Sequence, residues 1–132
     1  METHDHSTKG TVWTGRIISA LPALFLIVDG VAKLFKPAPV IEATLRLGYS
    51  ENTIIPIGIV LLICTVLYLI PKTSVLGAIL LTGYLGGAVA THVRAAEGAF
   101  PVIFPIIIGG LLWLGLYLRN RSLRVLVPLS ST

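Results

Sequence analysis

Charged residues are scarce in this chain of 132 residues: they make up 12% of it, while apolar residues reach 55% and the mean hydropathy is +0.90. A typical soluble domain carries about 25% charged residues. Because a domain of this size leaves much of its surface in contact with solvent, so apolar a chain would not stay dissolved in water. The composition therefore predicts an integral membrane protein.

Several chemical signatures are also missing. Cys64 is the single cysteine, which excludes an internal disulfide and a paired-cysteine redox motif. There is no glycine-rich phosphate loop and no nucleophile motif, and His4 and His6 supply too few ligands for a metal site. The net charge of +4 does not indicate nucleic-acid binding, because the basic residues flank apolar segments instead of sharing one face.

What the chain does have is four long apolar runs, at about 12–35, 54–70, 73–94 and 101–118. Each is close to the roughly 20 residues that a helix needs to cross a bilayer, and only helices satisfy their backbone there without a closed barrel. We therefore expect one all-α domain over 12–118, a bundle of four transmembrane helices. Residues 1–11 are predicted to be a mobile tail and 119–132 a basic cytoplasmic tail. The first run continues beyond Asp29 to Phe35, which favours a retained helix over a cleaved signal peptide.

A short mixed segment separates the first two runs. Pro37 and Pro39 are expected to end the first helix. Residues 39–47 then predict a short helix lying along the membrane interface, in which Glu42 and Arg46 are four apart and able to pair. Gly48 is placed to end it.

The basic residues predict an orientation. One side of the membrane would carry Lys9, Arg16, Lys72, Arg119, Arg121 and Arg124, and the other Lys36, Arg46 and Arg94, with Lys33 just inside. The positive-inside rule then places both termini in the cytoplasm, in the inner membrane of the cell. Four aromatic residues are expected to form an interfacial belt on that inner side: Trp13, Tyr68, Trp113 and Tyr117.

The third run contains a small-xxx-small pattern at Gly83 and Gly87, which Thr91 extends by one turn. Such a pattern lets a neighbouring helix approach closely. We expect the neighbour to be another helix of the same chain, and a homodimer through this face is the alternative.

Ionisable residues gather at one end of the expected bundle. Asp29 and Lys33 lie on one face near the end of the first helix, and His92 and Arg94 lie at the same end of the third. Ionisable groups at membrane depth are costly and usually face a cavity or a partner. One interpretation is a polar-headed pocket; the other is a structural network in which Asp29 pairs with Lys33 or Arg94 to tie the two helices together.

In the pocket interpretation, His92 and Asp29 are the candidate catalytic residues, since both can move a proton. Lys33, Arg94, Tyr84 and Thr91 are the candidate ligand-binding residues. Tyr84 lies near the middle of its run, where its hydroxyl would bind a ligand or a neighbouring helix.

Two strings of residues resemble the DoxX and DoxX-like family of small four-helix membrane proteins. They are Asp29-Gly30-Val31-Ala32-Lys33-Leu34-Phe35 and the stretch 81–94, LTGYLGGAVATHVR. The resemblance extends over about 15–118. It implies a quinone-linked role, after the quinone oxidoreductase subunits that are similar to the family, and relatives in a wider group act as membrane assembly factors. The family supplies no agreed catalytic residues.

These observations predict a membrane protein that binds a small lipophilic molecule, a quinone being the suggested cofactor, in a redox-related role with a partner protein. Two alternatives stay open: a non-catalytic assembly or scaffold protein, and a stand-alone membrane isomerase or hydrolase that uses Asp29 and His92 as acid and base.

Overall fold

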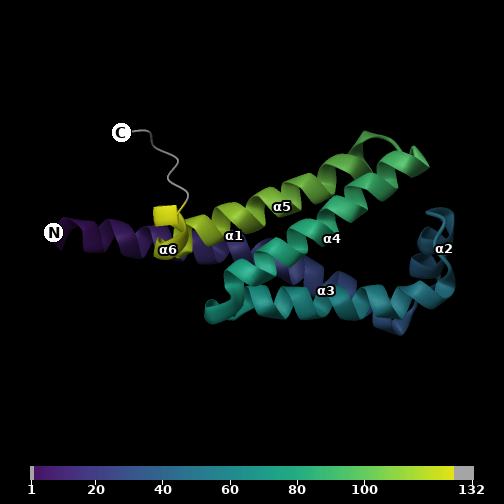
Figure 1. Cartoon of the computed structure of the whole chain (residues 1–132), viewed down its shortest axis with the longest axis horizontal. Helices are drawn as coiled ribbons and strands as arrows, with labels where there is room; N and C mark the ends of the chain where they lie inside the picture. Colours follow the sequence, from purple (N-terminus) through teal and green to yellow (C-terminus); the bar gives the residue numbers. More distant parts are fainter. Residues whose placement is uncertain (1, 127–132) are drawn as a thin grey trace.

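The computed structural model describes the backbone of residues 2–126 and the side chains of residues 9–126. Over this range it consists of helices and connecting turns (Figure 1). The helices are α1 (Glu2–Phe35), α2 (Ala38–Arg46), α3 (Ile54–Leu69), α4 (Ser74–Ala95), α5 (Ala99–Arg119) and α6 (Arg121–Leu126), with single 3-10 turns at η1 (Glu51–Thr53) and η2 (Pro71–Thr73).

The four long helices form a ring in which each packs against two others: α1 against α3 and α5, and α4 against α3 and α5. Successive long helices run in opposite directions, so α1 and α4 are parallel and lie across the ring from each other (Figure 1). The ends of α1 and α4 therefore meet the starts of α3 and α5 at one end of the bundle. We call this the pocket end, and we call the opposite end, with the α3–α4 turn and α6, the closed end.

Each long helix is apolar over a stretch long enough to cross a membrane: Lys9–Phe35, Glu51–Leu69, Pro71–Ala95 and Ala99–Arg119. In an apolar segment of 18 residues within each stretch, only 28% to 33% is buried inside the protein. The remaining apolar surface needs an apolar solvent, which the bilayer supplies. The prediction of an all-α membrane bundle is confirmed, and the chain is a multi-pass membrane protein.

The helices extend beyond the predicted bounds at both ends of the chain. α1 begins at Glu2 instead of residue 12, because the polar residues before Thr11 include no proline to stop a helix. At the other end, part of the predicted tail forms α6, whose Leu123 is buried against the bundle. The remaining tail, 127–132, and the side chains of His4 and His6 lie outside the described residues.

The short helix α2 forms where the sequence predicted it. Lys36 adopts a left-handed conformation (φ 54°) and Pro37 follows, so α1 ends and the chain turns. Gly48 (φ 90°) ends the segment. The expected pair between Glu42 and Arg46 does not form: Arg46 instead points its guanidinium at Glu97, 3.6 Å away beyond the end of α4.

The closed end is held together by a buried polar cluster. The Tyr68 hydroxyl donates to the Leu112 carbonyl oxygen at 2.6 Å and lies 2.9 Å from Ser19 Oγ. Arg119 donates to Ser19 Oγ at 3.1 Å and to the Tyr68 carbonyl oxygen at 3.3 Å. These contacts join α1, α3 and α5. Tyr68 is 0% exposed, so its place in an interfacial belt was wrongly predicted: its hydroxyl finds partners inside the bundle.

Glycines allow the close approach at this end. A Cβ added to Gly115 would lie against Ser19 Oγ, 2.7 Å from the Ser19 nitrogen and 2.9 Å from the Gly15 carbonyl oxygen. A Cβ added to Gly77 would collide with the Tyr68 backbone. The helices therefore touch backbone to backbone, in the manner that small residues permit in membrane proteins.

Candidate functional site

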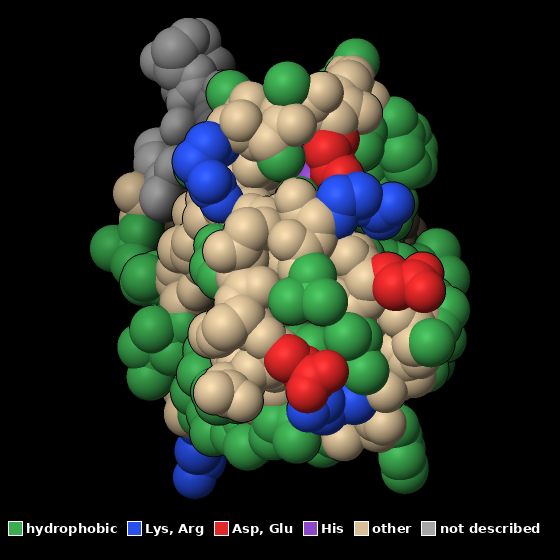
Figure 2. All heavy atoms as spheres, turned by 90° about the vertical axis from the view of Figure 1, so that its right-hand side faces the viewer, with side chains coloured by type: hydrophobic (Ala, Val, Ile, Leu, Met, Phe, Trp, Pro, Cys, Tyr) green, Lys and Arg blue, Asp and Glu red, His purple; other side chains and the backbone are tan. Residues whose placement is uncertain are grey.

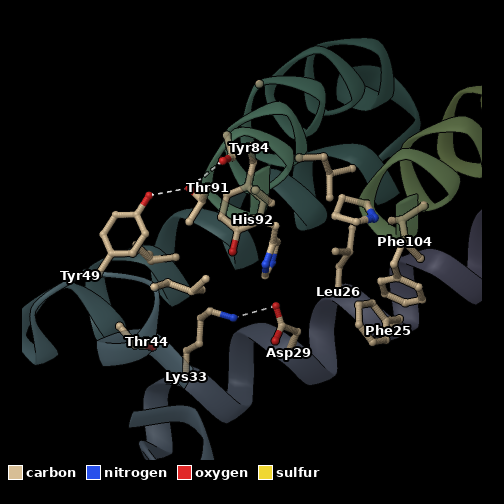
Figure 3. Close-up of a pocket in the computed structure, with 18 residues that line it drawn as sticks. Phe25, Leu26, Asp29, Lys33, Thr44, Tyr49, Tyr84, Thr91, His92 and Phe104 are labelled. Carbon is tan, nitrogen blue, oxygen red and sulfur yellow. Dashed lines mark hydrogen bonds and ion pairs between the residues drawn. The ribbon is translucent and has the colours of Figure 1, made fainter. Parts of the chain in front are cut away.

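The pocket end holds a cavity of about 580 Å³ between the diagonal helices α1 and α4 (Figure 3). Its lining comes from every long helix and from the α2 segment: Phe25, Leu26, Asp29, Lys33, Thr44, Leu47, Tyr49, Ile57, Gly83, Tyr84, Leu85, Gly87, Ala88, Thr91, His92, Phe104, Pro105 and Ile108. The cavity exists because α1 and α4 both pack against α3 and α5 and not closely against each other.

The deeper wall of the pocket is apolar and partly aromatic. Phe25 of α1 meets Phe104 of α5 edge to face, with 5.0 Å between ring centroids and 77° between ring planes. Leu26, Leu85 and Ile108 belong to the buried core and continue this wall. Such a surface suits a flat or hydrocarbon group of a ligand. Polar groups of a ligand would be bound at the opposite side of the pocket.

The polar side of the pocket begins with Asp29 and Lys33. Lys33 Nζ lies 2.8 Å from Asp29 Oδ2, and both side chains are partly exposed (Figure 3). The structural interpretation required a pair that ties α1 to α4. This pair is formed within α1, so it does not connect the two helices. Together the two groups are neutral, and they place charge and hydrogen-bonding capacity at the mouth of an apolar cavity.

Two polar atoms in the pocket have no hydrogen-bond partner among the described residues. Nδ1 of His92 lies 2.8 Å from Glu97 Oε1, whereas no bond is found for its other ring nitrogen, Nε2. The Tyr84 hydroxyl likewise makes none within the described part of the chain. Both residues line the cavity alongside Asp29 and Lys33 (Figure 3). Neither atom is fully enclosed by the protein, so a ligand or a water molecule in the cavity can act as its partner.

Residues 38–50, which we call the strap, cross the pocket end and contribute Thr44, Leu47 and Tyr49 to the lining. The strap is joined to α4 by the Tyr49 hydroxyl, 2.9 Å from Thr91 Oγ1, and by Arg94, which donates to the Leu47 carbonyl oxygen at 2.6 Å. Thr91 itself donates to the Gly87 carbonyl oxygen, so Tyr49 is the donor to Thr91. Figure 2 shows acidic and basic side chains scattered over this end among apolar ones.

Most of the predicted site residues therefore share one cavity. Asp29, Lys33, Tyr84, Thr91 and His92 all line it, although the Thr91 hydroxyl is engaged with its own helix and with the strap. Arg94 is outside the lining: it points at the strap, where its guanidinium also lies 3.2 Å from the position a Cβ on Gly48 would take.

Sequence reasoning missed Tyr49 and the aromatic wall as parts of the site. Tyr49 lies in a connecting segment, and 42 residues separate it from Thr91. No local pattern marks such a pair. Phe25 and Phe104 were hidden among the many apolar residues of the membrane spans, where an aromatic residue by itself carries no signal.

The prediction that Gly83 and Gly87 pack against another helix of the chain is wrong. A Cβ at either position would meet nothing within 4 Å, and both residues line the pocket. The close contacts are made elsewhere, for example between Gly30 of α1 and Gly58 of α3, where a Cβ on Gly58 would lie 3.0 Å from the Gly30 carbonyl oxygen. Within the side chains described, no three His, Cys, Asp or Glu residues gather in a possible metal site.

The sequence model of the DoxX-like family matches residues 17–115, which include the whole pocket lining. No curated protein and no solved structure matches the chain.

Proposed function

The chain belongs to the DoxX-like family, and we propose that its pocket binds a small lipophilic molecule with a polar head, a quinone being the class that fits best. The observation that supports this most is the pairing of an apolar, aromatic wall with unpartnered polar atoms in one cavity of a membrane-spanning bundle. A lipophile reaches such a site through the bilayer, and the polar atoms select its head.

The residues fit a quinone head in size and chemistry. The cavity volume, about 580 Å³, lies within the range of small-molecule sites, roughly 300–1,000 Å³. The Tyr84 hydroxyl is free to donate to a ring oxygen, and the rings of Phe25 and Phe104 offer an aromatic surface for the ring itself. Bound in this way, a quinone would supply the electron-transfer chemistry that the side chains of the chain lack.

The chain's own residues would orient the head and handle protons. Lys33 holds Asp29 at 2.8 Å and keeps this carboxylate at the polar side of the cavity. His92 and Asp29 are the groups able to exchange a proton with a bound molecule. Because no redox centre belongs to these residues, the redox role also requires a partner protein that delivers or removes electrons.

The location follows the distribution of basic residues. We propose an inner-membrane protein with both termini in the cytoplasm, since Lys72, Arg119, Arg121 and Arg124 lie at the closed end with α6. The pocket then opens at the outer side. In this proposal Gly83 and Gly87 give room to the ligand, and the face they form is not a homodimer contact.

A second candidate is a stand-alone isomerase or hydrolase in which Asp29 and His92 act as acid and base. It is favoured by their presence in the same cavity. It differs from the first in needing no partner protein, and it predicts turnover by the purified protein with a bell-shaped dependence of rate on pH.

The experiment is native mass spectrometry of the detergent-purified protein, with its extractable small molecules analysed beside it. Wild type is compared with His92→Ala and Asp29→Ala. Retention of a quinone or other lipophile by wild type, and its loss from variants that keep the wild-type helical circular dichroism, supports the proposal. Folded but empty wild type contradicts it, and variants that fail to fold favour the assembly or scaffold alternative.

A further inference from the structure

Glu97 links the pocket to the strap. It lies in the short connection between α4 and α5, and its two carboxylate oxygens have different partners. Oε1 is 2.8 Å from Nδ1 of His92, and Oε2 is 3.6 Å from Nε of Arg46 in α2. The carboxylate is 23% exposed, as is the imidazole it contacts. Glu97 itself does not line the cavity, and its shortest contact with a residue that does is the one with His92.

This contact decides which nitrogen of the neutral imidazole carries the hydrogen. An ionised carboxylate only accepts hydrogen bonds, so Nδ1 of His92 is the donor toward Glu97. Nε2 is then left with a lone pair and no hydrogen. Since Nε2 has no partner among the described residues, its lone pair is available to a molecule in the cavity. A second group in contact with one ring nitrogen commonly sets the role of the other in this way.

The other titratable or charged groups that share the pocket leave this assignment intact. Lys33 and Asp29 of α1 are engaged with each other at 2.8 Å. The Tyr49 hydroxyl of the strap donates to Thr91. The Tyr84 hydroxyl of α4 is free either to donate or to accept. Outside the cavity, Arg46 faces Glu97 and not the ring.

We propose that Glu97 is a positioning residue that makes His92 a hydrogen-bond acceptor, so that the pocket prefers a ligand bearing a hydroxyl group over its carbonyl counterpart. This inference rests on the proposed function and narrows it. For a quinone-type ligand, the preferred form is the reduced one, whose hydroxyl donates to Nε2. The oxidised form presents only carbonyl oxygens, and a carbonyl oxygen facing the Nε2 lone pair gains nothing.

The test compares the binding of a short-chain benzoquinol and the matching benzoquinone to the full-length protein in detergent under anaerobic conditions. The proteins are wild type, Glu97→Gln and Glu51→Gln. Glu51 is a matched control, because it is a carboxylate at the same end that pairs with Lys36 at 3.5 Å and does not line the cavity. A glutamine amide at position 97 can donate as well as accept, so it no longer forces the hydrogen onto Nδ1.

Wild type and Glu51→Gln are expected to bind the quinol about tenfold more tightly than the quinone, the effect of one well-placed hydrogen bond. In Glu97→Gln the ratio should fall to about two or less. Equal binding of the two probes by wild type, or a preference that survives Glu97→Gln, overturns the proposal.

A second measurement does not depend on any ligand. Two-bond ¹H–¹⁵N correlation spectra of the histidine-labelled protein report the tautomer of His92, whose signals are identified by their loss in His92→Asn. Hydrogen on Nδ1 in wild type, with a mixed state in Glu97→Gln, supports the role of Glu97; hydrogen on Nε2 in wild type overturns it. If neither probe binds but the Nδ1 tautomer is found, the proposed quinone site fails while the positioning by Glu97 stands.

Discussion

Polar side chains at the two ends of the bundle differ in whether they have hydrogen-bond partners within the protein. At the closed end, Tyr68, Ser19 and Arg119 bond to one another or to backbone carbonyls. At the pocket end, the Tyr84 hydroxyl and Nε2 of His92 line a cavity and have no partner within the described residues. The glycines differ in the same sense: Gly115 touches a neighbouring helix, while Gly87 faces open space.

This difference distinguishes polar groups that stabilise the fold from polar groups that are available to bind a ligand. A hydroxyl whose hydrogen-bond partners all belong to the protein stabilises the folded state, so its removal lowers the free energy of unfolding. A hydroxyl that lacks a partner in a cavity contributes little to folding and is available to a ligand. The comparison therefore predicts that variants at the two ends will affect different measurements.

The largest effect is expected from filling the pocket. Gly87→Leu would project a side chain into the cavity and should weaken the binding of the native lipophile about 100-fold or more, or about 2.7 kcal/mol, as measured by native mass spectrometry. Gly86→Leu is the matched control, since Gly86 also has open space around it but does not line the cavity. Equal loss of binding in both variants would contradict the assignment of the cavity.

At the closed end, Gly115→Ala should lower the free energy of unfolding by about 1–3 kcal/mol, because the new methyl group overpacks the contact with Ser19. Gly110→Ala, in the same helix, meets nothing within 4 Å and should be neutral or slightly stabilising. Denaturation in detergent, followed by circular dichroism, compares the two. A Gly115→Ala protein as stable as Gly110→Ala would show that the closed end accommodates the extra methyl group, against this account.

The smallest effect is expected at the strap. Tyr49→Phe removes the hydrogen bond to Thr91. This bond is exposed to solvent and therefore weak. The ligand should dissociate about two to five times faster, with little change in the stability of the bundle. Ligand exchange in detergent, followed over time, gives the rate. An unchanged rate would mean that the strap lines the pocket without retaining its contents.

The membrane bundle was predictable because its signals are local. Apolar runs of about 20 residues, separated by Pro37, by Pro71 and by the charged link near Glu97, mark the four spans without any knowledge of packing. The gathering of Asp29, Lys33 and His92 at one end also followed from counting spans, since alternate helices run in the same direction.

The packing was not predictable, because its decisive contacts join residues far apart in sequence. Arg119 and Ser19 are 100 residues apart, and Tyr68 and Leu112 are 44 apart. The glycine pattern at Gly83 and Gly87 is the one that small-residue rules select, yet those glycines face the cavity. A small-residue motif identifies a helix face without bulky side chains. What packs against that face depends on how all four long helices are arranged.

The central claim, that the two ends have separate tasks, is tested most directly by removing one hydroxyl from each and measuring both stability and ligand binding. Tyr68→Phe should lower the free energy of unfolding by about 1–3 kcal/mol, since it strips partners from a buried cluster, and leave ligand affinity unchanged. Tyr84→Phe should weaken ligand binding about fivefold and leave stability unchanged. If Tyr84→Phe destabilises the bundle as much as Tyr68→Phe and has no effect on binding, the pocket end is structural and the account is contradicted.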